Sequence, residues 1–580
     1  MKEQFLALLH QCRTSKYANV YLFLIFAFSL FVQCVLFHWF AFHSVLISSL
    51  WKNPLRFWAF YLPKISISLI ISCFVFVFKR KYWTIYVSLL TNVWIIAELI
   101  YFRSTRIFID AYSFFLVGNL HGFWGSVVMY FEWSFLVLLI PTLLLILGVF
   151  FFDNRKRNIA YTGIALCLWA IANIVSANVV NRNVYPNDKQ FFYSHIRAYF
   201  VQHICGWNVN IEYIQKTSVL HAFALDMKQL IEMPFEPKCT LSIEENQTMQ
   251  QLINTPQIKP TPTNPLIIIL VESLETWAVR PEITPNLCRF MDTHSNQILR
   301  ATRITSQTKG GNSGDGQMIC NTGLLPAAQG AACNRFPTNT YPSLSDLYTG
   351  TAMIQPGNLG TWNQAYMNKA YHIDTAFVNP YNFDSLTFNV LDTIYDRYAY
   401  TLAITIATHT PFLVDSKAAP AVLPQGMPTS MANYLNSMHY TDSCWGAFLS
   451  KIDTDSMLRN STICFMGDHI IFNTDQRGQF QDYCTANAPT YHPEEAYTTF
   501  IAYSPNIEQH TVVDEVTYQM DIYPTILHLI GCEEYYWKGF GINLLDPVAQ
   551  QHRPIEENEA YILSDKLLRS NWFATMDGEP

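Results

Sequence analysis

Charged side chains are scarce in this sequence. Asp, Glu, Lys and Arg make up 14% of its 580 residues, whereas a soluble domain usually carries about 25%. The deficit argues against an entirely soluble protein and predicts a membrane part. The net charge of −7, without any basic stripe, argues against nucleic-acid binding. No two cysteines are spaced as Cys-x-x-Cys, so a structural zinc ribbon is not expected.

Long apolar stretches crowd the first 180 residues. Each is close to the ~20 residues that a helix needs to cross the hydrocarbon core of a bilayer. The second stretch is interrupted by Pro63 and Lys64. The first is too long, and lies too deep in the chain, for a cleaved signal peptide. We therefore predict a five-helix transmembrane bundle over residues 1–181, with spans at 19–42, 57–78, 82–101, 131–152 and 159–180.

The basic residues of the short loops predict the orientation of these helices. Cytoplasmic loops carry an excess of Lys and Arg. Three such residues occur at the N-terminus and in each of the second and fourth connections, against two in the first and third. This bias places the N-terminus in the cytoplasm and everything after residue 181 outside. The protein is then expected to cross the membrane several times, with its C-terminal domain outside the cytoplasm.

Two further parts are predicted after the membrane part. Residues 182–263 are a juxtamembrane linker, which ends in the Pro-rich spacer Thr255–Pro265. From 264 to 580, strands and helices alternate, which favours an α/β domain with helices on both faces of a mostly parallel sheet. Cys320 and Cys333 flank a short loop that one disulfide could close in an exported domain.

Other elements of the outer domain can be assigned from their residue patterns. Ala432–Ile452 is predicted to be a long helix and Thr498–Tyr503 a strand. Tyr518–Ile530 is predicted to be a helix that is kinked at, or begins near, Pro524.

Three apolar runs of the outer domain end on residues that can bind a metal or a phosphate. Pro265–Val271 is followed by Glu272, Tyr398–Thr408 by His409, and Ser461–Met466 by Gly467, Asp468 and His469. Such runs are typical of central strands of a parallel sheet, and ligands bind beyond the carboxyl ends of these strands. The polar residues are therefore expected to converge. Two carboxylates with one imidazole suit Mn²⁺, Zn²⁺ or Mg²⁺, although each residue alone could equally be structural.

A nucleophile is the missing part of this site. The loop Lys309–Gly316 is rich in glycine and contains Ser313. A helix that begins near Gln317 would direct free N–H groups at an anion, and a bound cation would lower the pKa of the Ser313 hydroxyl. The alternative is a flexible glycine loop, and the spacing alone favours that alternative.

Several motifs of the outer domain follow one another in a characteristic order: Val271–Glu275, Ile283–Leu287, Gly311–Asp315, His409–Phe412, Tyr440–Asp442, Gly467–His469 and Asp521–Gly531. This order resembles the lipoteichoic acid synthase family of the alkaline phosphatase/sulfatase superfamily. The resemblance covers roughly residues 264–545, and the five-span N-terminal part is similar too. It implies the cytoplasmic (inner) membrane of a bacterium, with a periplasmic or extracellular catalytic domain.

The resemblance implies roles for individual residues. One divalent ion, usually Mn²⁺, would be held by Glu272, Ser313, Asp468 and His469. Ser313, which stands where the family often has Thr, would attack the head-group phosphate of a phospholipid. His409 would hold the phosphate or protonate the leaving alcohol, and Trp362 would line the head-group pocket.

Two positions depart from the family pattern. Relatives that handle glycerol phosphate typically have an Arg just after the Trp-Asn pair and a His before the nearby Gly-Asn. This sequence has Gln364 and Pro356 there. An Arg binds phosphate through a two-pronged fork that Gln cannot supply, so this departure weakens the glycerol-phosphate assignment and leaves the metal chemistry intact.

These observations leave more than one function open. The leading one is a membrane-anchored transferase that moves a phosphoglycerol-type head group from phosphatidylglycerol, through a phospho-Ser313 intermediate, to a hydroxyl of a glycan or lipid. Transfer of phosphoethanolamine from phosphatidylethanolamine is the close alternative. A sulfatase is a weaker one, because Ser313–Gln317 lacks the Pro and Arg of the C/S-x-P-x-R segment. A non-catalytic sensor or scaffold with a degenerate site is the fourth.

Overall fold

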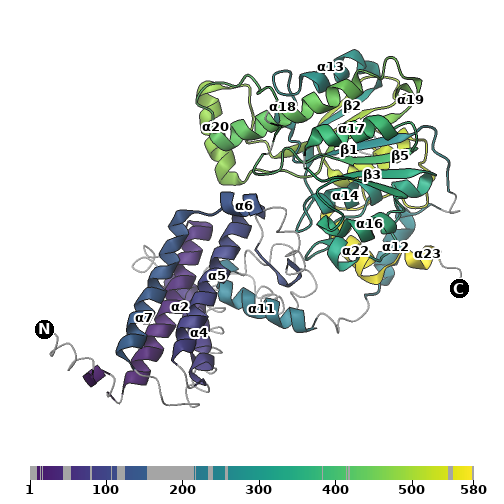
Figure 1. Cartoon of the computed structure of the whole chain (residues 1–580). Coiled ribbons are helices and arrows are strands. Elements are labelled where there is room, and N and C mark those ends of the chain that lie inside the picture. Colours follow the sequence, from purple (N-terminus) through teal and green to yellow (C-terminus); the bar gives the residue numbers. More distant parts are fainter. Residues whose placement is uncertain are drawn as a thin grey trace. The chain divides into compact units, whose positions relative to one another are not determined.

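The computed structural model describes residues 10–12, 15, 17–43, 54–78, 81–105, 108–113, 124–152, 214–215, 217–232, 239–254, 259–381, 383–412, 414–415, 418–546 and 553–577. The chain forms two units (Figure 1). The first comprises residues 1–111 and 127–235, and the second comprises residues 112–126 and 236–580.

The first unit is a bundle of apolar helices. Its helix α2 packs against the three others that run alongside it. The helices of this unit are α2 (Ala18–Phe42), α4 (Pro54–Phe76), α5 (Tyr82–Thr105), η3 (Trp133–Leu139), α7 (Ile140–Phe151) and α11 (Val219–Glu232), with α6 (Trp124–Met129) at the division between the units. Three helices in the described part of the chain are long and apolar enough to cross a membrane: Ala18–Phe42, Tyr82–Arg103 and Trp133–Phe151.

The prediction of five spans is therefore not confirmed as a count. The second predicted stretch does form a helix, α4, but its apolar part, Phe60–Phe76, is shorter than the other three. Pro63 lies inside this helix, and the buried ammonium group of Lys64 donates to the carbonyl oxygens of Phe60 and Thr217 over 3.2 and 2.9 Å. The fifth predicted span, 159–180, lies outside the described residues.

Polar side chains of the bundle face one another inside it. The Gln33 amide donates to the hydroxyls of Ser88 and Thr142, both over 2.9 Å, and the Asn92 amide donates to Thr142 over 2.7 Å. All four residues are buried and come from α2, α5 and α7. This arrangement is expected of helices surrounded by hydrocarbon, because lipid tails offer no hydrogen-bond partners and polar side chains must bond to one another.

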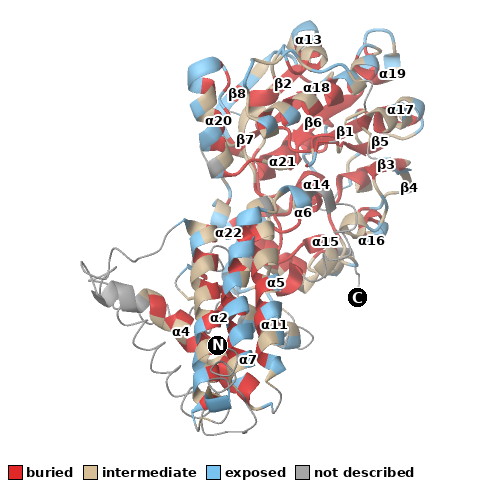
Figure 2. Cartoon of the chain, turned by 60° about the vertical axis from the view of Figure 1, so that its left-hand side comes forward, coloured by how far each residue is buried: buried red, intermediate tan, exposed pale blue. Residues whose placement is uncertain are grey.

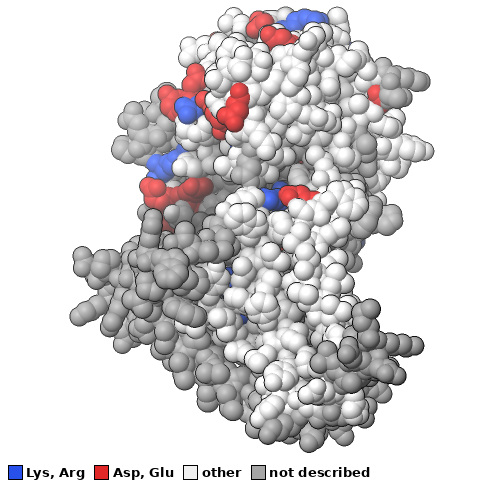
Figure 3. All heavy atoms as spheres, turned by 90° about the vertical axis from the view of Figure 1, so that its left-hand side faces the viewer, with Lys and Arg blue, Asp and Glu red and all other residues white. Residues whose placement is uncertain are grey.

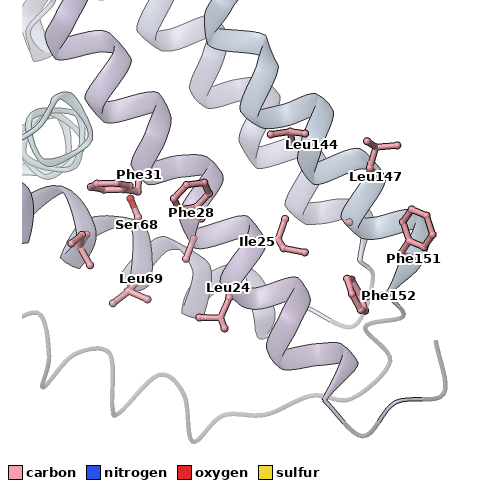
Figure 4. A pocket seen from close by; sticks show the side chains of 13 residues that line it. Leu24, Ile25, Phe28, Phe31, Ser68, Leu69, Leu144, Leu147, Phe151 and Phe152 are labelled. Atoms are coloured by element: carbon pink, nitrogen blue, oxygen red, sulfur yellow. The ribbon is translucent and has the colours of Figure 1, made fainter. Parts of the chain in front are cut away.

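The outer surface of the bundle is apolar. On the face drawn in Figure 3, its described side chains are almost all uncharged. An apolar cavity opens between α2, α4 and α7, and Ser68 is the one polar side chain that Figure 4 labels among those lining it. Such a surface suits contact with lipid tails.

The second unit is built on one eight-stranded sheet. The strand order is β4-β3-β5-β1-β6-β7-β2-β8. All neighbouring pairs are parallel except the two that involve β7, which is antiparallel to β6 and to β2. The strands are β1 (Leu266–Val271), β2 (Ile298–Thr305), β3 (Thr351–Pro356), β4 (Thr375–Asn379), β5 (Tyr400–Ile404), β6 (Thr462–Gly467), β7 (Tyr497–Tyr503) and β8 (Thr511–Tyr518).

Helices cover both faces of this sheet. Ile267, Ile269 and Val271 of β1 belong to a core formed with α13, α17, α18 and α20. Side chains alternate between the faces of a strand, and on the other face the Tyr400 hydroxyl donates to Asn321 of α14 over 2.7 Å. The central strands are accordingly buried throughout (Figure 2). This confirms an α/β domain with a mostly parallel sheet.

The longer helices of the second unit are α12 (Ile243–Leu252), α13 (Pro285–Thr293), α14 (Ser313–Thr322), α16 (Gln364–Ala370), α17 (Asp384–Ile394), α18 (Thr429–Leu449), α20 (Thr474–Asn487), α21 (Ile522–Leu529) and α22 (Glu557–Ser570). Helices of four residues are α15 (Ala332–Arg335), α19 (Ser456–Arg459) and α23 (Ala574–Asp577).

All three assigned elements form, with bounds that differ from the predicted ones. The predicted long helix is α18, shifted by three residues toward the N-terminus, and the predicted strand at Thr498–Tyr503 is β7. The predicted helix Tyr518–Ile530 is α21, which begins at Ile522 and therefore near Pro524, as one of the two alternatives had it, because Tyr518 closes β8. The Asp521 carboxylate accepts the backbone N–H of Tyr518 over 2.9 Å and so ends the strand with a turn.

The disulfide that could have closed the loop between Cys320 and Cys333 is not formed. Both thiols are free and buried. The Cys333 sulfur lies against Gly314 in the first turn of α14, whereas Cys320 is six residues further on, which is about 9 Å along a helix axis.

Candidate active site

The site lies where β1 and β6 end side by side. In their parallel register, Val271 is opposite Gly467, so Glu272 and the Asp468-His469 pair leave the sheet at the same edge. The backbone N–H of Asp468 donates to the carbonyl oxygen of Val271 over 3.2 Å, and the N–H of Ser273 donates to Asp468 Oδ1 over 2.7 Å. The two strand ends are thus locked together.

Glu272 is anchored from the next strand as well. Its backbone N–H donates to the Thr405 hydroxyl over 3.0 Å, and the Thr408 hydroxyl donates to its carbonyl oxygen. The Ser273 hydroxyl donates to Glu272 Oε1 over 2.9 Å. These hydrogen bonds hold the carboxylate in one orientation. The residue is also buried, with only 2% of its surface exposed.

Ser313 is the first residue of α14, so the helix begins four residues before the predicted start near Gln317. Two features make the helix begin at Ser313 rather than near Gln317. Asn312 has a φ of 41°, which turns the chain sharply, and the Asp315 carboxylate accepts the backbone N–H groups of Lys309 and Gly311, both over 2.9 Å. A carboxylate in the first turn also complements the helix dipole.

The glycines of this loop permit close packing. A Cβ on Gly316 would lie 2.9 Å from the Cβ of Asp468, and one on Gly314 would lie 3.3 Å from the Trp362 ring. The first distance is shorter than any ordinary contact between carbons, so only glycine lets α14 approach β6 this closely. The flexible-loop alternative is therefore not supported.

These elements bring four side chains together. The Ser313 hydroxyl donates to Glu272 Oε2 over 3.2 Å and lies 3.4 Å from His469 Nε2. His469 Nε2 is 3.4 Å from Glu272 Oε1 and 3.6 Å from Asp468 Oδ2. Glu272, Asp468 and His469 each offer one ligand atom, and these atoms lie within 4.8 Å of one another.

The donor atoms of this cluster fit a cation. Asp468 Oδ2 is buried and has no hydrogen-bond partner. His469 Nδ1 lies 3.0 Å from the carbonyl oxygen of Ile470, which can only accept, so Nδ1 carries a proton and Nε2 presents its lone pair to the carboxylates. Burial, and then the charge of Glu272, raise the pKa of Asp468 to about 7. A divalent cation would relieve this concentration of lone pairs and negative charge.

The pKa of His469 is affected in two directions. Burial favours the neutral ring, but the carboxylates of Asp468 and Glu272 outweigh burial and raise the pKa of His469. A proton and a cation are therefore alternative occupants of the same space.

His409 follows β5, which neighbours β1 on the side away from β6. Its Nδ1 donates to the Thr410 carbonyl oxygen over 2.6 Å. The loop between β5 and His409 is held by Asp384, whose carboxylate accepts the backbone N–H of Ile406 over 2.7 Å and the Thr441 hydroxyl over 2.6 Å. His409 thus lies at the same edge of the sheet as Glu272.

The two predicted head-group residues are placed differently from each other. Trp362 packs on Gly314, next to Ser313, with a φ of 50°. Gln364 is buried, and its amide donates to Asn368 Oδ1 over 2.7 Å and to the Met353 sulfur over 3.1 Å. Its amide group is therefore engaged by its own helix and by β3.

Several residues that hold the site were not identified from the sequence. Asp442 accepts the backbone N–H groups of Asn286 and Leu287, both over 2.9 Å, and so caps α13. The Gln519 amide donates to the carbonyl oxygens of Gly467 and Asp468 over 3.1 and 2.6 Å. The one available signal was the presence of Asn286, Asp442 and their neighbours in the motifs that carry the family resemblance.

A buried ion pair also stands beside the site. Arg477 Nη2 lies 2.7 Å from Glu275 Oε1, which accepts the backbone N–H of Ile471 over 2.9 Å as well. Glu275 Oε2 accepts the indole N–H of Trp277 over 2.6 Å. This pair fixes the loop that follows His469.

The fold and this cluster define a class: a sulfatase-like α/β domain with a carboxylate, histidine and serine site at the carboxyl edge of its sheet. The Sulfatase family model matches residues 266–532, and the model of the lipoteichoic acid synthase N-terminal domain matches residues 1–208. The chain therefore belongs to the lipoteichoic acid synthase family of the alkaline phosphatase/sulfatase superfamily, as the motifs predicted, and is a phosphotransferase enzyme of the membrane.

Individual relatives are similar over most of the chain. The lipoteichoic acid synthase of Staphylococcus aureus (strain USA300) is 22% identical over 553 residues, which are 89% of this chain and 83% of that protein. The lipooligosaccharide phosphoethanolamine transferase A (EptA) of Neisseria meningitidis has 11% identity and a TM-score of 0.52, over 87% of this chain and 95% of that one. The lipoteichoic acid synthase LtaP of Listeria monocytogenes has 17% identity and a TM-score of 0.46, over 58% of this chain and 98% of that one.

Proposed function

We propose that this chain is a metal-dependent transferase that moves the phosphoglycerol-type head group of a phospholipid to an acceptor hydroxyl outside the membrane. The observation that carries the proposal is the position of the Ser313 hydroxyl, 3.2 Å from Glu272 and 3.4 Å from His469. A serine hydroxyl at a helix start, beside a cluster of metal-binding groups, is suited to attack a phosphate.

One divalent ion would be held by Glu272, Ser313, Asp468 and His469. We propose Mn²⁺, with Zn²⁺ or Mg²⁺ as the alternatives, because two carboxylates and one imidazole suit these ions. When bound, the ion lowers the pKa of the serine hydroxyl and offsets the charge of the phosphate.

In the first half of the reaction, Ser313 Oγ bonds to phosphorus and the bond from phosphorus to the diacylglycerol oxygen breaks. The hydroxyl proton of Ser313 passes to water, and His409 protonates the departing alcohol. The head group then stays on Ser313 as a phosphodiester. In the second half, an acceptor hydroxyl bonds to phosphorus, the bond to Ser313 Oγ breaks, His409 takes the acceptor proton, and Ser313 Oγ takes back a proton from water.

Trp362 would line the pocket for the head group, beside Gln364. The Gln364 amide is neutral and already donates to Asn368, so it offers the phosphate less than an arginine would. This observation favours a second candidate, transfer of phosphoethanolamine, by the same steps and the same residues.

We further propose three parts with one orientation. Residues 1–181 form five spans with the N-terminus in the cytoplasm, 182–263 are juxtamembrane linker helices with a Pro-rich spacer, and 264–580 act outside the cytoplasmic membrane of a bacterium. The donor would be phosphatidylglycerol or phosphatidylethanolamine, and the acceptor a glycan or lipid. The membrane anchor supports a lipid as the donor, because an anchored enzyme stays close to the lipids of its membrane.

The test is release of diacylglycerol by the purified full chain with Mn²⁺ and labelled phosphatidylglycerol or phosphatidylethanolamine. The intact mass of the adduct on Ser313 then identifies the head group. We expect release from one of the two lipids and none from the Ser313→Ala variant. No release from either lipid, or equal release by Ser313→Ala, would contradict the proposal. Hydrolysis of a sulfate ester in a parallel assay would instead indicate a sulfatase.

A further inference from the structure

Tyr112 lies between helices α5 and α6 in the chain, yet it belongs to the second unit. The residue is buried. The guanidinium carbon of Arg335 lies 3.8 Å from the centre of its ring, and Arg335 Nη2 donates to its hydroxyl over 3.1 Å. Arg335 Nη1 donates to the carbonyl oxygen of Gln329 over 2.9 Å. Tyr112 is thus fixed on residues 329–335, which we call the wall segment.

Gly330 brings Tyr112 into direct contact with the backbone of the wall segment. Its φ is +64°, and an added Cβ would lie 2.3 Å from the Cβ of Tyr112. No side chain fits between the two residues, so the contact requires glycine for space as well as for conformation.

The wall segment contacts the Ser313 loop on both sides of the serine. An added Cβ on Gly310 would lie 3.5 Å from the carbonyl group of Gly330, and one on Gly314 would lie 3.4 Å from the Cys333 sulfur. The carbonyl oxygen of Cys333 also accepts from the Asn363 amide over 3.1 Å. The same few residues therefore support the nucleophile and the turn that carries Trp362.

We propose that Tyr112 is a positioning residue of the transferase: by clamping the wall segment, it fixes the loop of Ser313 and the turn of Trp362 relative to each other. The inference rests on the proposed function. It extends the catalytic machinery to a residue that precedes the Pro-rich spacer, so residues 264–580 alone would lack part of their own support.

The first experiment measures kcat and KM of full-length variants with phosphatidylglycerol and Mn²⁺. Tyr112→Ala should lower kcat/KM by about 10-fold to 100-fold, chiefly through kcat, because small misplacements of a nucleophile are costly. Tyr112→Phe keeps the ring over Arg335 and should stay within a few-fold of the wild type. If phosphatidylethanolamine is the active donor, it replaces phosphatidylglycerol throughout.

Gly330→Ala and Gly426→Ala form a matched pair. Both glycines have positive φ, +64° and +76°, so both variants carry similar backbone strain, but nothing lies within 4 Å of an added Cβ on Gly426. Gly330→Ala should reproduce the loss seen in Tyr112→Ala, whereas Gly426→Ala should keep wild-type kcat. Equal losses in the two variants would contradict the clamp.

A second readout does not depend on activity. Cys333 of the wall segment and Cys464 of β6 are both buried. In Tyr112→Ala, a maleimide should alkylate Cys333 several-fold faster than in the wild type, while Cys464 stays protected. Joint labelling of both thiols would mean general unfolding and would overturn the inference, as would unchanged protection of Cys333. If the wild type released no diacylglycerol, the proposed function would fail, and the cysteine result alone would still decide the clamp.

Discussion

Two glutamates of one short motif, Glu272 and Glu275, show how differently buried carboxylates can be accommodated. Their exposed fractions are 2% and 0%. Glu275 has a cation from its own chain, Arg477, together with an indole N–H and a backbone N–H. Glu272 instead receives two hydroxyls, from Ser273 and Ser313, and faces the lone pair of His469.

The two glutamates differ in whether the chain itself supplies a positive charge to the buried carboxylate. A buried carboxylate is costly unless it is paired. The pair at Glu275 is complete, so this region stabilises the loop and has no need of a ligand. The carboxylate of Glu272 has no Lys or Arg partner among the described residues, and we propose that a divalent cation supplies the missing positive charge. The predictions below test this difference, from the largest expected effect to the smallest.

Ser313→Ala should break the site most severely. Removing a nucleophile typically costs several orders of magnitude in kcat, and we expect a loss of at least about 10³-fold in diacylglycerol release. Ser273→Ala is the matched control, since both hydroxyls donate to Glu272, over 2.9 and 3.2 Å. It should cost far less, because Ser273 takes no part in bond formation. Equal losses would show that the hydroxyls act only on Glu272.

Glu275→Ala should destabilise the sheet domain. It leaves Arg477 buried without its partner, which typically costs about 3–5 kcal/mol and corresponds to a fall of roughly 10 °C in unfolding temperature. The control is Glu282→Ala, which removes a comparable pair with Arg280 at the surface and should cost less than about 1 kcal/mol. Similar unfolding temperatures for the two variants would refute the structural role of Glu275.

Mn²⁺ should stabilise the protein through Glu272 and not through Glu275. Mn²⁺ at about 100 times its Kd should stabilise the wild type by about 2.7 kcal/mol. Glu272→Gln should lose most of this gain, while Glu275→Ala should keep it despite its lower starting stability. Thermal unfolding with and without Mn²⁺, followed by removal of the ion with a chelator, measures both. A full Mn²⁺ gain in Glu272→Gln would rule out the proposed ligand set.

Asp384 sharpens the comparison, because it is a buried carboxylate that has hydrogen bonds but no cation partner among the described residues. Burial raises the pKa of Asp384 to about 6, against about 3.9 in an unfolded chain. Between these values the folded protein binds the proton more tightly, so its stability contribution falls as pH rises from about 4 to 6. Asp384→Asn should remove this slope, at most about 1.4 kcal/mol per pH unit. If stability fell equally steeply with pH in the metal-free wild type and in metal-free Asp384→Asn, Asp384 would not be the cause of the slope.

Much of the site could be predicted because it depends on local patterns. Apolar runs that end in Glu272 and Asp468 identify buried parallel strands and their carboxyl ends. Their convergence follows from the geometry of such a sheet. The start of α14 was misplaced because glycines usually break helices, whereas here Asp315 and the approach to Asp468 favour the helix from Ser313 onward.

The remaining features could not be predicted because they depend on distant pairs. Arg477 is about 200 residues from Glu275 and Asp442 more than 150 from Asn286, and no periodicity connects such positions. Charge patterning can indicate that Glu275 needs a partner, but it cannot say which cation the fold brings there. The count of five spans is not confirmed, because the apolar part of α4 is the shorter Phe60–Phe76 and residues 159–180 lie outside the described part of the chain. The carbonyl partners of Lys64 in this bundle are likewise distant in sequence or depend on the helix having formed.

Gly316 carries a consequence for how this enzyme can change. It touches no reacting group, yet its missing side chain sets the spacing between the helix that bears the serine and the strand end that bears Asp468. A single methyl group there would push the helix of the serine away from Asp468, although every reacting group would stay chemically intact. Substitution at this position would yield a protein that has its full complement of functional groups and is inactive through misalignment alone.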